Sequence, residues 1–249
     1  MMPANLHPSD AEGIVAWALQ QWEHRLTIAC SFSKEDILLV DFARRINPSV
    51  RVFALDTGRL HAETLQTAER VRTEMAVSIE WYAPKTHDVE LLVSRSGLFS
   101  FRESVENRRE CCHIRKVEPL LRALSGVDAW ITGQRRAHGP TRAGLKVFES
   151  APNGEPLKLN PLAFWSTAQV DNEIAARRLP VNPLYDQGFP SIGCAPCTRA
   201  VQPGEDDRAG RWWWEAAEHK ECGLHGRAPW LSELNTNENN NTHIVEVSR

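Results

Sequence analysis

The sequence predicts an α/β fold built on a doubly wound, mostly parallel sheet and followed by a C-terminal extension. Within the first 82 residues, three short apolar runs alternate with two amphipathic helical patterns. A β-α-β-α-β order favours parallel strands joined by right-handed crossovers. The chain has 249 residues, 42% of them hydrophobic, so it can bury a large core. We therefore expect one α/β domain over residues 1–200 and a mobile segment over residues 201–249.

Each element follows from apolar spacing, capping residues and prolines. Ser9 or Asp10 can cap a first helix that runs to Trp22. The predicted strands are Leu26–Cys30, Val50–Leu55, Val77–Tyr82, Ala129–Thr132 and Leu157–Leu162. The further predicted helices are Ile37–Ile46, Leu60–Met75, His87–Ser94, one that follows residues 111–117 and ends near Ser125, and Ser166–Arg178. Residues 95–109 are expected to be loop with some helix.

The overall composition excludes several classes of protein. A net charge of −3 argues against a general nucleic-acid or membrane surface. No apolar run approaches the length of about 18 residues that a membrane span needs, and the N-terminus MMPANLHPSDAEG lacks a signal-peptide pattern. We therefore expect a cytoplasmic protein. In that setting its six cysteines suggest metal or redox chemistry rather than disulfides.

Polar loops follow three of the predicted strands. Ser31-Phe32-Ser33 precedes a helix, so its hydroxyls and amides suit an anion, although Ser33 also fits an ordinary helix cap. The second strand ends in residues 55–59, LDTGR, and open α/β sheets bind ligands at such carboxyl ends. The fourth strand opens into an arginine-rich stretch, residues 133–142, which suits phosphate or sulfate recognition. A solvated surface loop is the alternative there.

Four cysteines form a constellation of an adjacent pair, Cys111 and Cys112, and a C-x-x-C motif, Cys194 and Cys197. Four thiolates suit a structural zinc ion or an iron–sulfur cluster. Successive side chains tend to diverge, so the adjacent pair favours the separate iron corners of a cluster. A thioredoxin-like dithiol is a third possibility. Cys30 is expected to be a buried structural thiol.

The C-terminal part carries a sixth cysteine and a run of tryptophans. Cys222 stands among ionisable residues, which favours a reactive thiolate, and its place on a late segment would let it visit a site and then a partner. An incidental thiol on a frayed end is the alternative. The three residues Trp212–Trp214 cannot all face one core on a helix. They either pack beneath this segment or meet a partner or ligand.

Seven motifs together resemble the assimilatory adenylyl-sulfate (APS) reductases, relatives of the phosphoadenylyl-sulfate (PAPS) reductases. They are SFSKED at 31–36, LDTGR at 55–59, ECCHIRK at 110–116, ITGQRR at 131–136, GCAPC at 193–197, GRWWWE at 210–215 and KECGLH at 220–225. The resemblance covers nearly the whole chain and implies the adenine-nucleotide α-hydrolase type of fold. The paired-cysteine and C-x-x-C elements distinguish cluster-containing APS reductases from cluster-free PAPS reductases.

The resemblance also implies the roles of particular residues. The four cysteines would hold a [4Fe-4S] cluster, and Cys222 would be the nucleophile that forms an S-sulfocysteine. Reduced thioredoxin or a glutaredoxin-like protein would then release sulfite. The implied substrate contacts are Ser31, Phe32, Ser33, Leu55, Asp56, Thr57, Lys116, Gly133, Arg142, Arg208, Arg211 and His225. Lys34 departs from the small residue that the family often carries, so the resemblance does not fix the pose of the nucleotide at this loop, and we expect Lys34 to face solvent.

Several alternatives stay open at this point. One alternative is a closely related enzyme that reduces PAPS, or both APS and PAPS. A non-redox ATP-pyrophosphatase-like enzyme would share the sheet and the loop after the first strand, but it offers no reason for the ECGLH motif. A zinc-binding interaction module without catalysis is the fourth hypothesis. A homo-oligomer is also compatible with the sequence.

Overall fold

A six-stranded sheet forms the centre of the computed structural model, which describes residues 3, 6–139, 142–150 and 155–216. The strands are β1 (Leu26–Ala29), β2 (Arg51–Leu55), β3 (Ile79–Tyr82), β4 (Ala129–Ile131), β5 (Phe148–Glu149) and β6 (Leu157–Leu159). Their order is β3-β2-β1-β4-β6-β5, and only the β5–β6 pair is antiparallel. The predicted mostly parallel sheet is confirmed. The edge strand β5 was missed because two residues are too few to show alternation.

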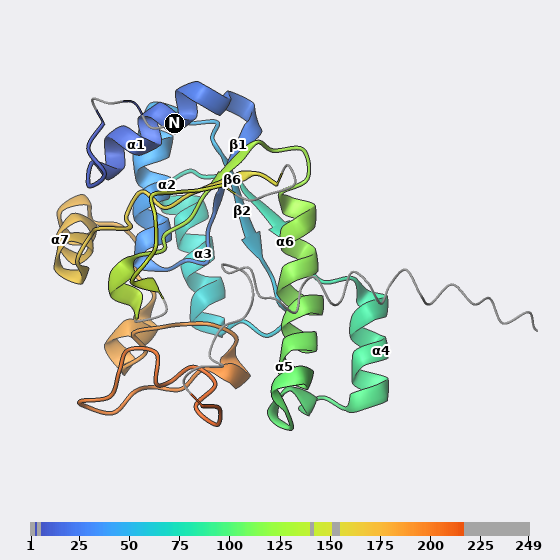
Figure 1. Cartoon of the computed structure of the whole chain (residues 1–249). Coiled ribbons are helices and arrows are strands. Elements are labelled where there is room, and N and C mark those ends of the chain that lie inside the picture. Colours follow the sequence, from blue (N-terminus) through green and yellow to red (C-terminus); the bar gives the residue numbers. More distant parts are fainter. Residues whose placement is uncertain (1–2, 4–5, 140–141, 151–154, 217–249) are drawn as a thin grey trace, which may run out of the picture.

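Most helices agree with the predicted ones, but one helix, at residues 105–112, lies largely in the stretch 95–109 that was expected to be loop with some helix (Figure 1). They are α1 (Ala11–Trp22), α2 (Lys34–Ile46), α3 (Ala62–Glu74), α4 (Thr86–Ser96), α5 (Val105–Cys112), α6 (Glu118–Ala123) and α7 (Thr167–Arg177). A π-helical turn, His113–Val117, joins α5 to α6. Helix α2 begins three residues before the predicted start because Ser33 Oγ accepts a hydrogen bond from the backbone N–H of Asp36 at 3.2 Å.

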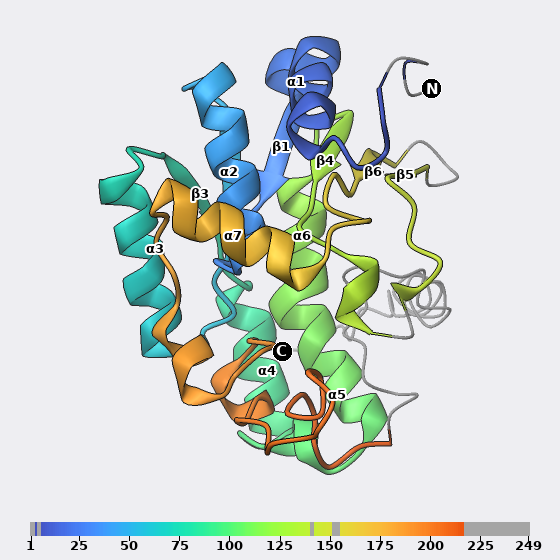
Figure 2. The ribbon, with the colours of Figure 1, turned by 90° about the vertical axis from the view of Figure 1, so that its left-hand side faces the viewer.

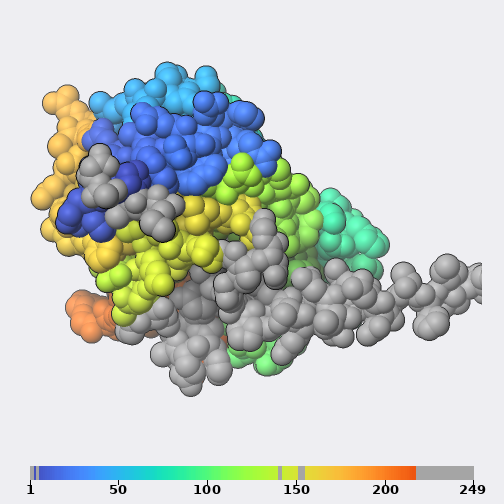
Figure 3. Space-filling view, turned by 45° about the horizontal axis from the view of Figure 1, so that its top comes forward, coloured from blue at the N-terminus to red at the C-terminus, as the bar shows by residue number. Residues whose placement is uncertain are grey.

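Helices cover both faces of the sheet. On one face α1, α2, α3 and α7 share a core with inward-facing strand residues such as Ile28, Val52 and Ile131. On the other face, α6 packs against Phe53 and Trp130. Figure 1 shows the helices around the sheet, and in the space-filling view of Figure 3 the blue segments of α1 and α2 form one continuous surface beside α7. Each fully buried large apolar side chain contributes about 1.5–3 kcal/mol to folding, so these two layers hold the sheet rigidly.

The strand order places a topological switch point at β1, since β2 and β4 lie on its opposite sides. Ligands of open α/β sheets bind outside the carboxyl ends of strands at such a point. The chain that follows α7, up to residue 216, lies at this carboxyl end of the sheet (Figure 2). The proposed boundary near residue 200 stays a prediction. Among the helices of the described chain, none has the length and apolar character to cross a membrane.

Candidate nucleotide and cysteine site

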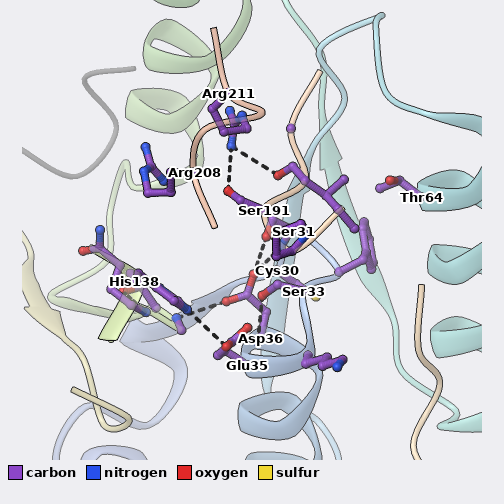
Figure 4. Close-up of a pocket in the computed structure, with 18 of the residues that line it drawn as sticks. Cys30, Ser31, Ser33, Glu35, Asp36, Thr64, His138, Ser191, Arg208 and Arg211 are labelled. Carbon is purple, nitrogen blue, oxygen red and sulfur yellow. Dashed lines mark hydrogen bonds and ion pairs between the residues drawn. The ribbon is translucent and has the colours of Figure 1, made fainter. Parts of the chain in front are cut away.

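A cavity of about 660 Å³ opens at the carboxyl ends of β1 and β4. Its walls come from the loops after these strands, residues 30–36 and 132–135, and from the later segments 190–194 and 207–212. Figure 4 shows labelled side chains of the first loop, of His138 and of the later segments around one space, with Asp36, Ser191 and Arg211 among them. Clefts of 300–1,000 Å³ are typical of small-molecule sites. The volume and position therefore suit a ligand the size of a nucleotide.

One buried carboxylate, Asp36, joins the loops after β1 and β4. Its Oδ2 accepts hydrogen bonds from Ser31 N–H at 2.7 Å and Ser31 Oγ–H at 2.6 Å, and its Oδ1 accepts one from Gly133 N–H at 3.0 Å. Burial raises the pKa of Asp36, and the two Ser31 hydrogen bonds oppose that rise. A Cβ on Gly133 would lie 2.7 Å from Glu35 Cβ and 3.0 Å from the backbone nitrogen of Asp36, so only glycine fits. The two loops are thus fixed to each other.

A second buried carboxylate, Glu35, orders the arginine-rich loop after β4. Glu35 Oε1 accepts from Arg135 Nε at 2.9 Å and lies 3.1 Å from His138 Nε2. His138 Nδ1 in turn lies 3.2 Å from Arg142 Nη1. Burial opposes ionisation here, but the hydrogen bond and charge of His138 and the charge of Arg135 together lower the pKa of Glu35 to about 2. The sequence analysis missed Glu35 and His138, since no local pattern pairs residues a hundred positions apart.

Four of the predicted cationic contact residues also line the cavity: Lys116, Arg142, Arg208 and Arg211. Lys116 and Arg211 are only 8% and 7% exposed. The Arg211 guanidinium is held within 3.5 Å of the Ser191 hydroxyl and 3.4 Å of the Ile192 carbonyl oxygen (Figure 4). Such fixed, partly desolvated cations suit the oxygens of phosphate or sulfate groups.

The four motif cysteines line a second, smaller cavity. All four are buried and are free thiols. Three N–H groups of residues lining this cavity, Arg59 Nη1, Arg115 Nε and Trp212 Nε1, are buried without a hydrogen-bond partner among the described residues. N–H donors around sulfur ligands are characteristic second-shell groups of iron–sulfur sites. The donor set and these unpaired groups therefore fit a cluster with four cysteine ligands.

The geometry of the thiols differs from that of a site for one metal ion. In the part of the chain that the structure describes, no three His, Cys, Asp or Glu side chains form a group able to hold a single ion. The four cysteines do line one small cavity, together with Arg59, Arg115 and Trp212. Burial raises the pKa of Cys197 to about 11 and also raises that of Cys111. Burial opposes ionisation of Cys194 as well, but the charge of Lys116 and a hydrogen bond to Thr57 hold the pKa of Cys194 below its ordinary value.

The two cavities share a wall. Lys116, Cys194 and Trp212 line both of them. Lys116 lies on the π-helical turn that directly follows Cys111 and Cys112, and such irregular turns often occur at functional sites. An anion in the larger cavity and a group held by the cysteines would thus be immediate neighbours, with an ammonium group between them.

The described end of the chain is fastened to both cysteine elements. Trp212 N–H donates to the Cys197 carbonyl oxygen at 3.1 Å. Arg108, on the helix of the cysteine pair, forms an ion pair with Glu215 at 2.6 Å, and these side chains are 1% and 4% exposed. Trp212 lies beneath Arg108, with 4.7 Å from the guanidinium carbon to the ring centroid. Residues 212–215, which precede Cys222 in the sequence, are therefore held in place against both cysteine elements.

Most of the predicted contact residues meet at the larger cavity. Those that line it are Ser31, Phe32, Ser33, Leu55, Thr57, Lys116, Gly133, Arg142, Arg208 and Arg211. Asp56 is not among the lining residues, and its carboxylate accepts from Gly58 N–H at 2.8 Å. Cys222 and His225 lie outside the described residues.

Two other sequence predictions can be followed in the structure. Lys34 does not simply face solvent, because its Nζ pairs with Asp171 at 2.8 Å and lies 4.6 Å from the centre of the Tyr185 ring. Of the tryptophans, Trp212 is buried at 1% exposure, as expected for one that packs beneath this segment, whereas Trp213 is 39% exposed, and its contact with a partner or ligand stays a prediction.

Comparison with known proteins gives a consistent picture. The family model described as "Phosphoadenosine phosphosulfate reductase domain" matches residues 25–200. An adenosine 5'-phosphosulfate reductase of Burkholderia cepacia is 51% identical over 81% of this chain and 80% of its own length. One from Allochromatium vinosum is also 51% identical, over 81% of this chain and 79% of its own length.

Solved structures agree. A phosphoadenylyl-sulfate (PAPS) reductase from Candida auris superposes with a TM-score of 0.65 and 27% identity, covering 79% of this chain and 91% of that one. The FMN adenylyltransferase of Candida glabrata, with a TM-score of 0.54, 14% identity and coverage of 95% of this chain and 81% of that one, shares the fold alone. Both the motifs at the two cavities and the match over most of the chain lead to the same conclusion: this protein belongs to the phosphoadenosine phosphosulfate reductase domain family.

Proposed function

We propose that this protein reduces APS to sulfite and AMP in sulfate assimilation toward cysteine, with electrons from reduced thioredoxin or a glutaredoxin-like protein. The observation that carries the proposal is the shared wall of Lys116, Cys194 and Trp212 between a nucleotide-sized cavity and the four-cysteine cavity. The names of the bacterial relatives, adenosine 5'-phosphosulfate reductases, support APS as the substrate. We further propose that the reaction takes place in the cytoplasm.

The cavity offers separate environments to the two parts of APS. The loops at residues 31–33 and Gly133, which Asp36 holds together, line the part of the cavity proposed for the nucleotide. The phosphate and sulfate oxygens would face the cationic side chains Lys116, Arg142, Arg208 and Arg211. Because these cations are held in place before substrate arrives, they stabilise developing charge without reorganisation, usually the largest catalytic contribution.

The four buried thiols would hold a [4Fe-4S] cluster as thiolates, and Arg59, Arg115 and Trp212 would donate to its sulfur atoms. When bound, the cluster supplies a fixed local charge next to Lys116 that tunes the field at the sulfate group. Lys116 holds the substrate oxyanion on the other side of the shared wall. The adjacent cysteine pair, Cys111 and Cys112, favours this group over a single zinc ion, because successive side chains diverge and suit separate iron corners.

We propose that Cys222 is the nucleophile. Its thiolate attacks the sulfur of APS, an S–S bond forms, and the bond between that sulfur and the phosphate oxygen breaks. AMP leaves with the electron pair and is stable as an anion, while Cys222 becomes an S-sulfocysteine. The negative charge of both products is offset by four side chains that line the cavity: Lys116, Arg142, Arg208 and Arg211.

The donor protein completes the cycle with two thiols. One donor thiolate attacks the Cys222 sulfur, and sulfite leaves with the electrons of the broken S–S bond. The second donor thiolate then attacks the donor sulfur of the mixed disulfide and frees the Cys222 thiolate. The donor ends as a disulfide, so its two thiols supply the two electrons that convert bound sulfate to sulfite.

PAPS is the second candidate substrate, because the Candida auris PAPS reductase shares the fold at 27% identity. The two cysteine elements favour APS. Anaerobic protein incubated with APS and no thiol should carry a sulfonate on the Cys222 peptide, detected by mass spectrometry. Reduced thioredoxin should remove it and release one sulfite per site. A Cys222→Ser variant should bind AMP but gain no sulfonate, and sulfite release by that variant would refute the mechanism. If PAPS gives the Cys222 sulfonate and APS does not, the mechanism stands but the substrate is PAPS.

A further inference from the structure

An exposed apolar patch lies beside the cysteine cavity and has no role in the reaction described above. It consists of Leu98, Phe99, Arg102 and Trp213, which we call the Phe99 patch. Leu98, Phe99 and Trp213 are 59%, 60% and 39% exposed. The first three residues connect α4 to α5, and Trp213 belongs to the last described segment. Both segments lie at the same end of the molecule in Figures 1 and 2.

The patch is held in a fixed shape from below. Arg59 Nη2 donates to the Leu98 carbonyl oxygen at 2.7 Å, and its guanidinium lies 4.9 Å from the centre of the buried Phe101 ring. Phe101 packs on Trp214, with 6.1 Å between ring centroids. The Arg102 guanidinium lies 5.5 Å from the Trp214 ring centre, so the two segments form one surface. A preorganised surface loses little entropy when it binds a partner.

The residue types also indicate a binding surface. Aromatic residues and arginine dominate the energetic centres of protein interfaces. Arg102 contacts four aromatic rings and donates to the Pro196 carbonyl oxygen at 3.3 Å. Within the described ranges it has no carboxylate partner. Its charge is therefore available to an acidic or carbonyl group on another protein.

We propose that the Phe99 patch is the docking surface for the reduced dithiol protein that releases sulfite from Cys222. This inference rests on the proposed function. Cys222 follows Trp213 by nine positions, so the thiol stays within about 30 Å of the patch however the intervening chain runs. A donor seated on the patch therefore remains inside the reach of the sulfur it must attack. Pro196 also places the patch at the edge of the Cys194–Cys197 loop.

The size of the patch favours a transient donor over a second copy of the chain. Large aromatic side chains bury about 150–250 Å² each, so the exposed parts of these residues amount to roughly 300 Å². Stable dimers bury about 800 Å² on each partner, whereas redox encounters use the smallest interfaces. A donor must also leave after each turnover, and a small surface permits that.

The test separates the two half-reactions in the cluster-loaded protein. Phe99→Ala and Trp213→Ala are compared with Leu121→Ala, since Leu121 on α6 is 61% exposed and lies about 24 Å along the helical run from Val105. We expect unchanged formation of the Cys222 sulfonate from APS and unchanged sulfite release by dithiothreitol in all three. The KM for reduced thioredoxin should rise about tenfold in the two patch variants, with kcat at saturating thioredoxin unchanged, and stay constant in the control.

Other outcomes would overturn the proposal in distinguishable ways. An unchanged KM for thioredoxin in both patch variants removes the docking role. A patch variant that changes the oligomeric state in light scattering assigns the surface to a second copy of the chain. Slower sulfonate formation in the patch variants means that the chain's own C-terminal segment uses the surface. Absence of the sulfonate in the unmodified protein refutes the proposed function itself.

Discussion

Replacing Glu35 with glutamine should destabilise the fold strongly near neutral pH and less in acid. Among the described residues, Glu35 is the carboxylate that pairs with the buried guanidinium of Arg135, and the two side chains are 9% and 4% exposed. Removing one partner of a buried ion pair typically costs about 3–5 kcal/mol. The lowered pKa of Glu35, which arises from the same contacts, corresponds to a similar magnitude. A fall from 4.5 to about 2 on folding corresponds to roughly 3 kcal/mol at pH 7.

The direction of the pKa shift determines how the stabilisation by Glu35 changes with pH. Because folding lowers the pKa of Glu35, its ionised form stabilises the protein above pH 4.5, and that contribution disappears as the pH falls toward 2. The difference in unfolding free energy between wild type and Glu35→Gln should therefore shrink from roughly 3 kcal/mol at pH 7 to about 1.5 kcal/mol at pH 3. Urea unfolding followed by far-UV circular dichroism, at equal iron content, measures this difference.

A matched control is available on α3. Glu74 pairs with Arg70 at 2.8 Å, but both side chains are about half exposed, so Glu74→Gln should leave the free energy of unfolding almost unchanged at every pH. The reasoning fails if Glu35→Gln is no more destabilising than Glu74→Gln. It also fails if the Glu35→Gln difference is the same at pH 7 and pH 3.

Two further predictions concern the cysteine cavity. Cys194→Ser should lose iron and acid-labile sulfide together with sulfite production, measured by metal and sulfide analysis of anaerobic protein, and full iron content in this variant would contradict the assignment. Glu215→Ala should destabilise the protein by about 3–5 kcal/mol, because it removes the carboxylate with which the buried Arg108 guanidinium forms an ion pair. The double variant Arg108→Met/Glu215→Met should recover much of that loss in thermal unfolding, whereas strictly additive losses would show that the two side chains are not coupled.

The sequence was sufficient for the sheet and most helices, because each depends on residues near one another along the chain. The run Val50–Leu55 predicts a strand from its own alternation, and the structure places β2 at Arg51–Leu55. The Ser166 cap likewise predicts α7, and Ser166 accepts from the Gln169 backbone N–H. The carboxyl ends of parallel strands meet at one edge, so the meeting of the Ser31 and Gly133 loops also followed from strand order.

Contacts between distant residues could not be predicted in this way. The residues near Glu35 in the sequence do not predict its contacts with Arg135 and His138. Those near Arg108 do not predict its ion pair with Glu215. Lys34 is similar, since the expectation of solvent exposure came from the small residue common in relatives, while its ion pair depends on where α7 lies. These are pairs that only the packed fold brings together.

The hydrogen bond from the Gly133 N–H to the Asp36 carboxylate bears on the order in which parts of the protein fold during synthesis. It links residues 97 positions apart, whereas β1, β2 and β3 are all present within the first 82 residues. Contacts of such long separation close late in folding, since the intervening chain must first lose its freedom. A nascent chain released from the ribosome up to α4 can already pair three strands but has only half of its ligand cavity. Competence to bind nucleotide should therefore arrive in one late step, when β4 docks against β1.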